Sequence, residues 1–132
     1  MAAVKNLAEI VLVVDDMDRS IRFYRDGLGL EVFSPPQLPT KFLLVGDSRG
    51  GVPQQIVLVP RSAPTSGERV KVLHHIGLEV APDDFEPERR RLQAAGFELR
   101  TGKHPFLPVE AFYLDDPDGN EIEIAAWRGP AL

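Results

Sequence analysis

Residues 9–14 read Glu-Ile-Val-Leu-Val-Val, and residues 75–80 read His-Ile-Gly-Leu-Glu-Val. The alternating apolar positions of the first run recur in the second at an offset of 66 residues, from Ile10 to Ile76. Each run leads through acidic residues into a helix-like stretch that closes on Gly-Leu-Glu (29–31) or Gly-Phe-Glu (96–98). The chain therefore consists of two copies of one unit, and residues at matching positions are candidates for one shared site.

The spacing of apolar and turn residues predicts the same order of elements, β-α-β-β-β, in both copies. In the first copy we expect strands at 7–14, 30–33, 42–45 and 55–59, with a helix at 17–28. In the second copy we expect strands at 73–80, 97–100, 111–114 and 121–126, with a helix at 82–95. The prediction is one α+β domain over 1–132, with two tandem modules (about 6–59 and 70–127) and a polar linker at 60–69.

Composition excludes several classes of protein. The chain has 132 residues and no cysteine, which rules out disulfides, zinc–thiolate sites and thiol catalysis. Its net charge is −5, and the acidic excess lies in residues 67–132, so nucleic acid is not an expected partner. The chain lacks the run of about 18 apolar residues that a membrane span needs. Since the N-terminus has no apolar signal core, we expect a cytoplasmic protein.

Four positions emerge when the phase of each strand is compared between the copies, because alternate side chains of a strand share a face. Glu9 lies on the face opposite the apolar set of its strand, and His75 is at the matching position. Pairing 56–58 with 122–124 matches Val57 to Glu123, again on that second face. The four equivalent positions are Glu9, Val57, His75 and Glu123.

An imidazole and two carboxylates form a plausible ligand set for one divalent metal ion. The mixture of nitrogen and oxygen suits Mn²⁺, Fe²⁺, Co²⁺, Ni²⁺ or Zn²⁺ better than Ca²⁺, which prefers oxygen alone. Glu9, His75 and Glu123 are therefore the candidate ligands. The alternative is that Glu9 and His75 merely pair with each other, as an ion pair or a hydrogen-bonded structural histidine would.

Other polar residues are weaker candidates. His74 has the opposite phase to His75 and is expected to be structural, and His104 lies in a proline-flanked loop. Gln55 has the phase of Val57 and would substitute for it if a bulge shifted the strand. Asp116-Pro-Asp-Gly lacks the length of a calcium loop and is interpreted as a β-turn.

These motifs resemble the vicinal oxygen chelate superfamily, which includes glyoxalase I, bleomycin-resistance proteins, fosfomycin-resistance proteins and extradiol dioxygenases. The first half is similar through Glu-Ile-Val-Leu-Val-Val-Asp-Asp (9–16) and Ser-Ile-Arg-Phe-Tyr-Arg-Asp-Gly-Leu-Gly-Leu (20–30). The second half is similar through residues 75–80 and Asp-Pro-Asp-Gly-Asn-Glu-Ile-Glu-Ile (116–124). The resemblance covers roughly residues 6–127 and implies paired modules forming a cupped sheet around a metal.

Carried over residue by residue, the family's ligand positions are Glu9, Val57, His75 and Glu123. Glu123 and His75 match the family's usual ligands, whereas Glu9 stands where His or Gln is usual. Val57 departs most, because glyoxalase I-like members use a carboxylate there and an aliphatic side chain cannot bind metal. The resemblance therefore implies a three-ligand member, as fosfomycin-resistance enzymes and extradiol dioxygenases are, rather than a glutathione-dependent glyoxalase.

The expected function is that of a glyoxalase-like metal-dependent enzyme (lyase, isomerase or dioxygenase type) acting on a small substrate with adjacent oxygens. Glu9 or Glu123 would serve as catalytic base, and two-module members commonly form homodimers. Residues proposed to line the substrate pocket are Phe42, Gln55, Val57 and Tyr113, with Val11, Val13 and Gly77. The alternative is a non-catalytic protein of the bleomycin-resistance type that binds a small molecule.

Overall fold

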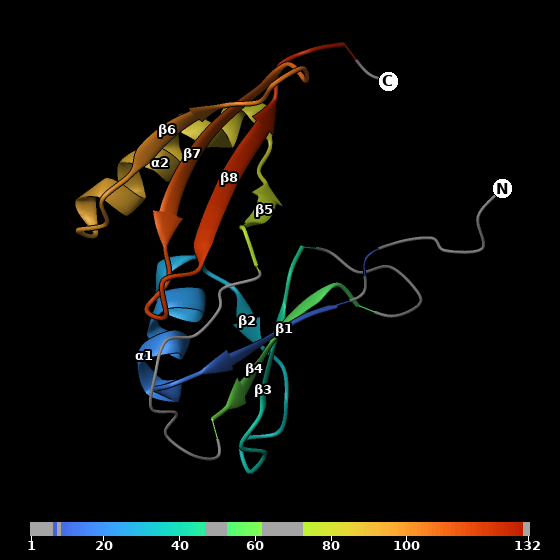
Figure 1. The fold of residues 1–132 in the computed structure, drawn as a ribbon, viewed down its shortest axis with the longest axis vertical. Helices are drawn as coiled ribbons and strands as arrows, with labels where there is room; N and C mark the ends of the chain where they lie inside the picture. Colours follow the sequence, from blue (N-terminus) through green and yellow to red (C-terminus); the bar gives the residue numbers. More distant parts are fainter. Residues whose placement is uncertain (1–6, 8, 47–52, 62–72, 131–132) are drawn as a thin grey trace, which may run out of the picture. The chain divides into compact units, whose positions relative to one another are not determined.

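The computed structural model describes residue 7 and the ranges 9–46, 53–61 and 73–130. The chain divides into two compact units, Met1–Gly67 and Glu68–Leu132, and each is described by itself. Among the described residues, no helix is long and apolar enough to cross a membrane. Both units contain a four-stranded mixed sheet and a helical segment (Figure 1).

In the first unit the sheet has the order β1-β4-β3-β2. Its elements are β1 (Glu9–Val14), α1 (Met17–Ile21), the π-helix η1 (Arg22–Gly27), β2 (Glu31–Val32), β3 (Lys41–Leu44) and β4 (Gln55–Pro60). Strands β1 and β4 pair in parallel, with Glu9 opposite Gln55 and Val11 opposite Val57, while the other neighbours are antiparallel. The predicted linker at 60–69 falls mostly outside the described residues.

The helical segment of the first unit differs from the single α-helix predicted over 17–28. Asp16 caps α1 by accepting a hydrogen bond from the Arg19 N–H at 3.1 Å. The helix then widens into η1, whose Leu28 N–H donates to the Phe23 carbonyl five residues earlier. Both adjacent aromatic residues, Phe23 and Tyr24, are buried by this wider turn.

The two faces of the first sheet are unlike. The buried face holds residues Leu12, Val14, Leu43, Ile56 and Leu58. The opposite face, shared by alternate residues, carries Val11 and Val13, which are 49% and 46% exposed. This alternation in β1 is the one expected from the sequence.

The second unit repeats the topology of the first, with the sheet order β5-β8-β7-β6. Its elements are β5 (Ile76–Glu79), the 3₁₀ turn η2 (Pro82–Asp84), α2 (Phe85–Ala94), β6 (Arg100–Lys103), β7 (Val109–Asp115) and β8 (Glu121–Trp127). The parallel pair β5–β8 puts Gly77 opposite Glu123 in the register that Val11 and Val57 have in the first unit. The α+β class and the β-α-β-β-β order in each unit are confirmed.

Two predicted strand bounds are wrong. Strand β5 begins at Ile76 rather than at 73, so His75 lies one residue before it. Strand β6 spans Arg100–Lys103 rather than 97–100. The reason is local: Gly96 adopts φ 96° after α2, and the Phe97 N–H donates back to the Leu92 carbonyl, so this segment ends the helix instead of pairing with β7.

Candidate metal centre

The turn before β8 sets the position of the acidic residues on that strand. Asp116, 5% exposed, accepts hydrogen bonds from the Asp118 and Asn120 N–H groups through Oδ1 and from Asn120 Nδ2 through Oδ2. Gly119 completes the turn at φ 80°. Because the carboxylate of Asp116 is used inside its own loop, this segment is a β-turn, as predicted, and it delivers the chain into β8 at Glu121.

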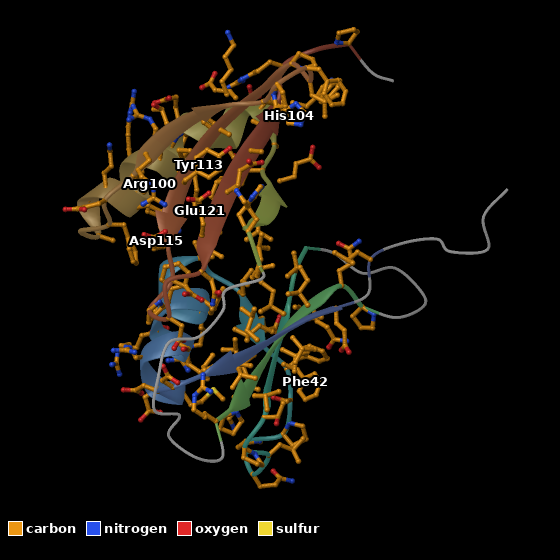
Figure 2. All side chains as sticks on the ribbon, viewed as in Figure 1. Phe42, Arg100, His104, Tyr113, Asp115 and Glu121 are labelled. Atoms are coloured by element: carbon orange, nitrogen blue, oxygen red, sulfur yellow. The ribbon has the colours of Figure 1, made fainter. Side chains whose placement is uncertain are left out.

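The alternation of β8 separates core residues from site residues. Ile122 and Ile124 are buried on one face, while Glu121 and Glu123 are partly exposed on the other. In the antiparallel pair β7–β8, Tyr113 stands directly opposite Glu123 and Asp115 opposite Glu121. Figure 2 shows Arg100, Tyr113, Asp115 and Glu121 gathered along the strands of this sheet.

His75 and Glu123 lie close enough to bind one ion. His75 Nε2 is 3.7 Å from Glu123 Oε2, and the side chains are 36% and 17% exposed, so an ion from solvent can reach both. Bonds of about 2.0–2.2 Å from a divalent metal to nitrogen and oxygen allow two ligand atoms to be up to about 4.2 Å apart. The two side chains therefore fit a common metal ion without rearrangement of the strands.

Tyr113, predicted as a pocket residue, is the hydrogen-bond partner of the same carboxylate. Its hydroxyl donates to Glu123 Oε2 at 2.6 Å. This hydrogen bond, with desolvation and the negative charges of Glu123 and Glu121, raises the pKa of Tyr113 to about 12. The phenol therefore keeps its proton at neutral pH and acts as a donor.

His74 contacts His75 at Nδ1, the ring nitrogen that does not face Glu123. His74 Nδ1 lies 2.8 Å from His75 Nδ1, so one of the two atoms must carry the proton and donate to the other. Within the described part of the chain, His74, His75 and Glu121 form a group with ligand atoms within 4.8 Å of one another. Since β5 starts only at Ile76, strand alternation does not separate the histidines, and the expectation that His74 points away from His75 is wrong.

An ion-pair network borders these residues. Arg100 on β6 donates to Asp115 through Nη1 at 3.2 Å and Nη2 at 2.7 Å, and also to Glu121 at 3.1 Å. The cation offsets part of the negative charge that Asp115 and Glu121 bring to this end of the sheet. Sequence reasoning missed the roles of His74, Glu121 and Arg100, although the alternation of β8 already puts Glu121 on the face of Glu123.

The predicted ligand Glu9 and the predicted pocket residues Phe42, Gln55 and Val57 lie in the first unit. Glu9 is exposed and stands opposite the half-buried Gln55 at the start of both strands. Val57 is buried, with 3% of its surface exposed, and stands opposite Phe42. Phe42 packs edge-on against Phe33 with ring centroids 6.4 Å apart. The roles of Glu9 as ligand or base, and of Phe42, Gln55 and Val57 as pocket residues, stay predictions.

His104 has a structural use. Its Nδ1 accepts hydrogen bonds from the Phe106 and Leu107 N–H groups at 3.2 and 2.9 Å, which holds the turn between β6 and β7. Figure 2 shows it toward the other end of the sheet from Asp115. A nitrogen committed to two backbone donors has no lone pair for a metal.

Comparison with known proteins confirms the resemblance over most of the chain. A model of the Glyoxalase/Bleomycin resistance protein/Dioxygenase superfamily matches residues 6–124. A glutathione transferase FosA from Serratia marcescens is 29% identical over 129 residues, covering 91% of this chain and 79% of that protein.

Solved structures share the fold at low sequence identity. A glyoxalase family protein from Bacillus anthracis has a TM-score of 0.72 at 18% identity, covering 97% of this chain and 99% of that one. A fosfomycin resistance protein, FosX, from Listeria monocytogenes has a TM-score of 0.69 at 20% identity, covering 95% and 94%. With its matching sheets, its repeat and the family model over residues 6–124, the chain belongs to the Glyoxalase/Bleomycin resistance protein/Dioxygenase superfamily.

Proposed function

We propose that this protein is a metal-dependent enzyme that binds a small substrate with adjacent oxygens. The observation that carries the proposal is the approach of His75 Nε2 to Glu123 Oε2 at 3.7 Å, with the Tyr113 hydroxyl on the same carboxylate oxygen. The pair supplies one nitrogen and one oxygen ligand, which suits Mn²⁺, Fe²⁺, Co²⁺, Ni²⁺ or Zn²⁺. Glu9 is proposed as the third ligand, on the strength of its matching position in the repeat.

Each residue has a defined task in this proposal. When bound, a divalent cation withdraws electron density from substrate oxygens and stabilises negative charge that develops on them. His75 and Glu123 hold the ion, and Tyr113 holds the Glu123 carboxylate in place by donating its proton to Oε2. Glu9 or Glu123 is the proposed base, which accepts a proton from substrate or water.

The aliphatic residue at position 57 in the first unit narrows the range of reactions to consider. Val57 stands where a carboxylate would be needed as a fourth ligand, and its side chain cannot bind metal. The proposal therefore favours three protein ligands and a substrate that completes the coordination shell of the metal ion. Because the similar proteins include a glutathione transferase FosA and fosfomycin resistance proteins, transfer of glutathione to fosfomycin is the reaction to test first.

A second candidate function rests on a different observation. The open face of the first sheet carries the exposed apolar side chains Val11, Val13 and Phe33. An apolar surface of this kind suits a protein that binds a small apolar molecule without chemistry.

The expected homodimer is a separate proposal, and analytical ultracentrifugation tests it directly.

Metal analysis decides between the two functions. Protein purified without chelator is assayed for Mn, Fe, Co, Ni and Zn, then stripped and reloaded while its melting temperature is followed. The enzyme proposal expects one ion per chain and a higher melting temperature on reloading. Turnover of fosfomycin in the presence of glutathione is then followed by phosphorus NMR. If no metal is found and none raises the melting temperature, the enzyme proposal is wrong.

A further inference from the structure

Tyr113 is on β7, and its ring lies over the neighbouring strand β6 at Gly102, which has no side chain. In register, Tyr113 stands opposite Arg100, and Ala111 stands opposite Gly102. Gly102 is therefore the diagonal neighbour of Tyr113 on the same face of the sheet. A Cβ atom built on Gly102 would lie 1.9 Å from Tyr113 Cε2 and within 3 Å of two further ring atoms, Cζ and Cδ2. No side chain other than hydrogen fits there while the ring keeps its place.

Arg100 does not compete for this space, because carboxylates hold its guanidinium. It donates to Asp115 and Glu121, which stand opposite each other on β7 and β8. The ring of Tyr113 is thus free to lean toward Gly102 rather than stand upright over its own strand. Gly102 does not need left-handed backbone, since its φ is not among the positive values in the chain. The close approach of the ring is what requires a glycine at this position.

The position of the ring determines the position of the hydroxyl. Ordinary contact begins at 3.4 Å, so a methyl group on residue 102 would push the nearest ring atom about 1.5 Å from its 1.9 Å position. The Tyr113 hydroxyl is 2.6 Å from Glu123 Oε2, and hydrogen bonds between oxygens extend to only about 3.0 Å. A displacement of that size breaks the bond and frees Glu123 to rotate.

We propose that Gly102 is a positioning residue of the metal centre: it seats the Tyr113 ring, and the Tyr113 hydroxyl then holds Glu123 beside His75. The inference rests on the proposed function in so far as Glu123 is a metal ligand. The seating itself is a property of the metal-free protein. Partners that orient a ligand contribute about 10- to 100-fold to metal affinity, which sets the size of the expected effect.

The chain offers a matched control on the other side of the same carboxylate. Gly77 stands opposite Glu123 on β5, and a Cβ atom there would lie 3.5 Å from Glu123 Oε1, an ordinary contact. Gly77→Ala therefore adds the same methyl group beside the same side chain without a clash. Gly102→Ala and Gly77→Ala together separate displacement of the ring from a general effect of losing a glycine in a strand.

The first measurement uses metal-free protein. The ring signals of Tyr113 and the carboxyl-carbon signal of Glu123 are observed by NMR after selective ¹³C labelling, and assigned with Tyr113→Phe and Glu123→Gln. In Gly102→Ala the Glu123 signal is expected to move to its position in Tyr113→Phe, whereas Gly77→Ala leaves the Tyr113 ring signals in place. Unchanged Tyr113 and Glu123 signals in Gly102→Ala would overturn the proposal, whether or not the protein binds metal.

The second measurement is metal affinity by competition with a chelating dye, in variants shown to be folded by circular dichroism. We expect Gly102→Ala and Tyr113→Phe to bind Co²⁺ about 10- to 100-fold more weakly, and Gly77→Ala to stay within about threefold of the parent. In Tyr113→Ser, which removes the ring, adding Gly102→Ala should change the affinity no further. An equal loss in that background would show that Gly102 acts by another route. A parent protein without affinity for any of the five metals would instead refute the proposed function.

Discussion

Tyr113 and Glu123 stand directly opposite each other on β7 and β8, and the phenol donates a 2.6 Å hydrogen bond to the carboxylate oxygen that faces His75. One oxygen atom is thus shared between a neutral donor and the imidazole 3.7 Å away. A metal ion would bind the same oxygen. A change at the proposed metal centre should therefore change the hydrogen bond and the pKa of Tyr113.

The pKa of Tyr113 should fall when Glu123 loses its charge. The hydrogen bond to Glu123 is the largest cause that raises this pKa from 10.0 to about 12, so Glu123→Gln should bring it back toward 10. Ultraviolet titration of the phenolate band measures it. The chain has only one other tyrosine, Tyr24, which is fully buried, and Tyr113→Phe supplies its background curve.

The same shift gives a stability dependence on pH with a defined sign. A group whose folded pKa is raised stabilises the fold fully below its unfolded value, and the contribution is lost as pH rises through the folded value. For Tyr113 the loss should fall between pH 10 and about 12. Urea unfolding across this range should show a steeper decline in the parent than in Tyr113→Phe. Identical slopes would mean that the hydrogen bond is absent in solution.

Removing a proposed ligand should weaken metal binding without unfolding the protein. His75→Ala and Glu123→Ala should each reduce Co²⁺ affinity by more than about tenfold, since each takes away one bond to the ion. His104→Ala is the matched histidine control, because His104 Nδ1 is used by the backbone of its own turn. Isothermal titration calorimetry measures the three variants. Unchanged affinity in Glu123→Ala would show that the metal centre is elsewhere.

Glu9→Ala tests the third ligand by the same titration. If Glu9 binds the ion, the loss should match that of His75→Ala, and the double variant with Glu123→Ala should bind no metal. The exposed Glu31 provides the control, because Glu31→Ala removes a carboxylate at a strand of the same sheet. Equal affinities of the parent and Glu9→Ala would leave His75 and Glu123 as the ligands and remove Glu9 from the set.

The turn that delivers β8 should be a determinant of stability. Asp116→Ala leaves the Asp118 and Asn120 N–H groups without the acceptor they share, which should cost about 2–3 kcal/mol. Asp26→Ala, which removes only an exposed partner of Arg25, should leave the denaturation midpoint nearly unchanged. Chemical denaturation compares the two. A loss in Asp116→Ala no greater than in Asp26→Ala would contradict the role given to this turn.

The parts of the fold that are predictable from the sequence are those that depend on local patterns. The alternation of apolar residues in β1 and β8 shows which side chains face the core, and the run Asp-Pro-Asp-Gly at 116–119 marks its turn. Where the hydrogen bonds that end a helix override the strand pattern, the prediction fails. Phe97 has strand character but bonds back to Leu92 at the end of α2, and this moves β6 to Arg100.

The sequence by itself determined the repeat, the element order and the face of β8 on which Glu123 lies, because periodicities of two and 3.6 residues are local properties of the chain. Only the tertiary structure decided which side chains meet. Three contacts depend on the lateral register between strands. They are the approach of His75 to Glu123, the hydrogen bond from Tyr113 to Glu123, and the packing of the Tyr113 ring over Gly102, which has no side chain. Register joins residues far apart in the chain, and single-strand periodicity does not encode their distances.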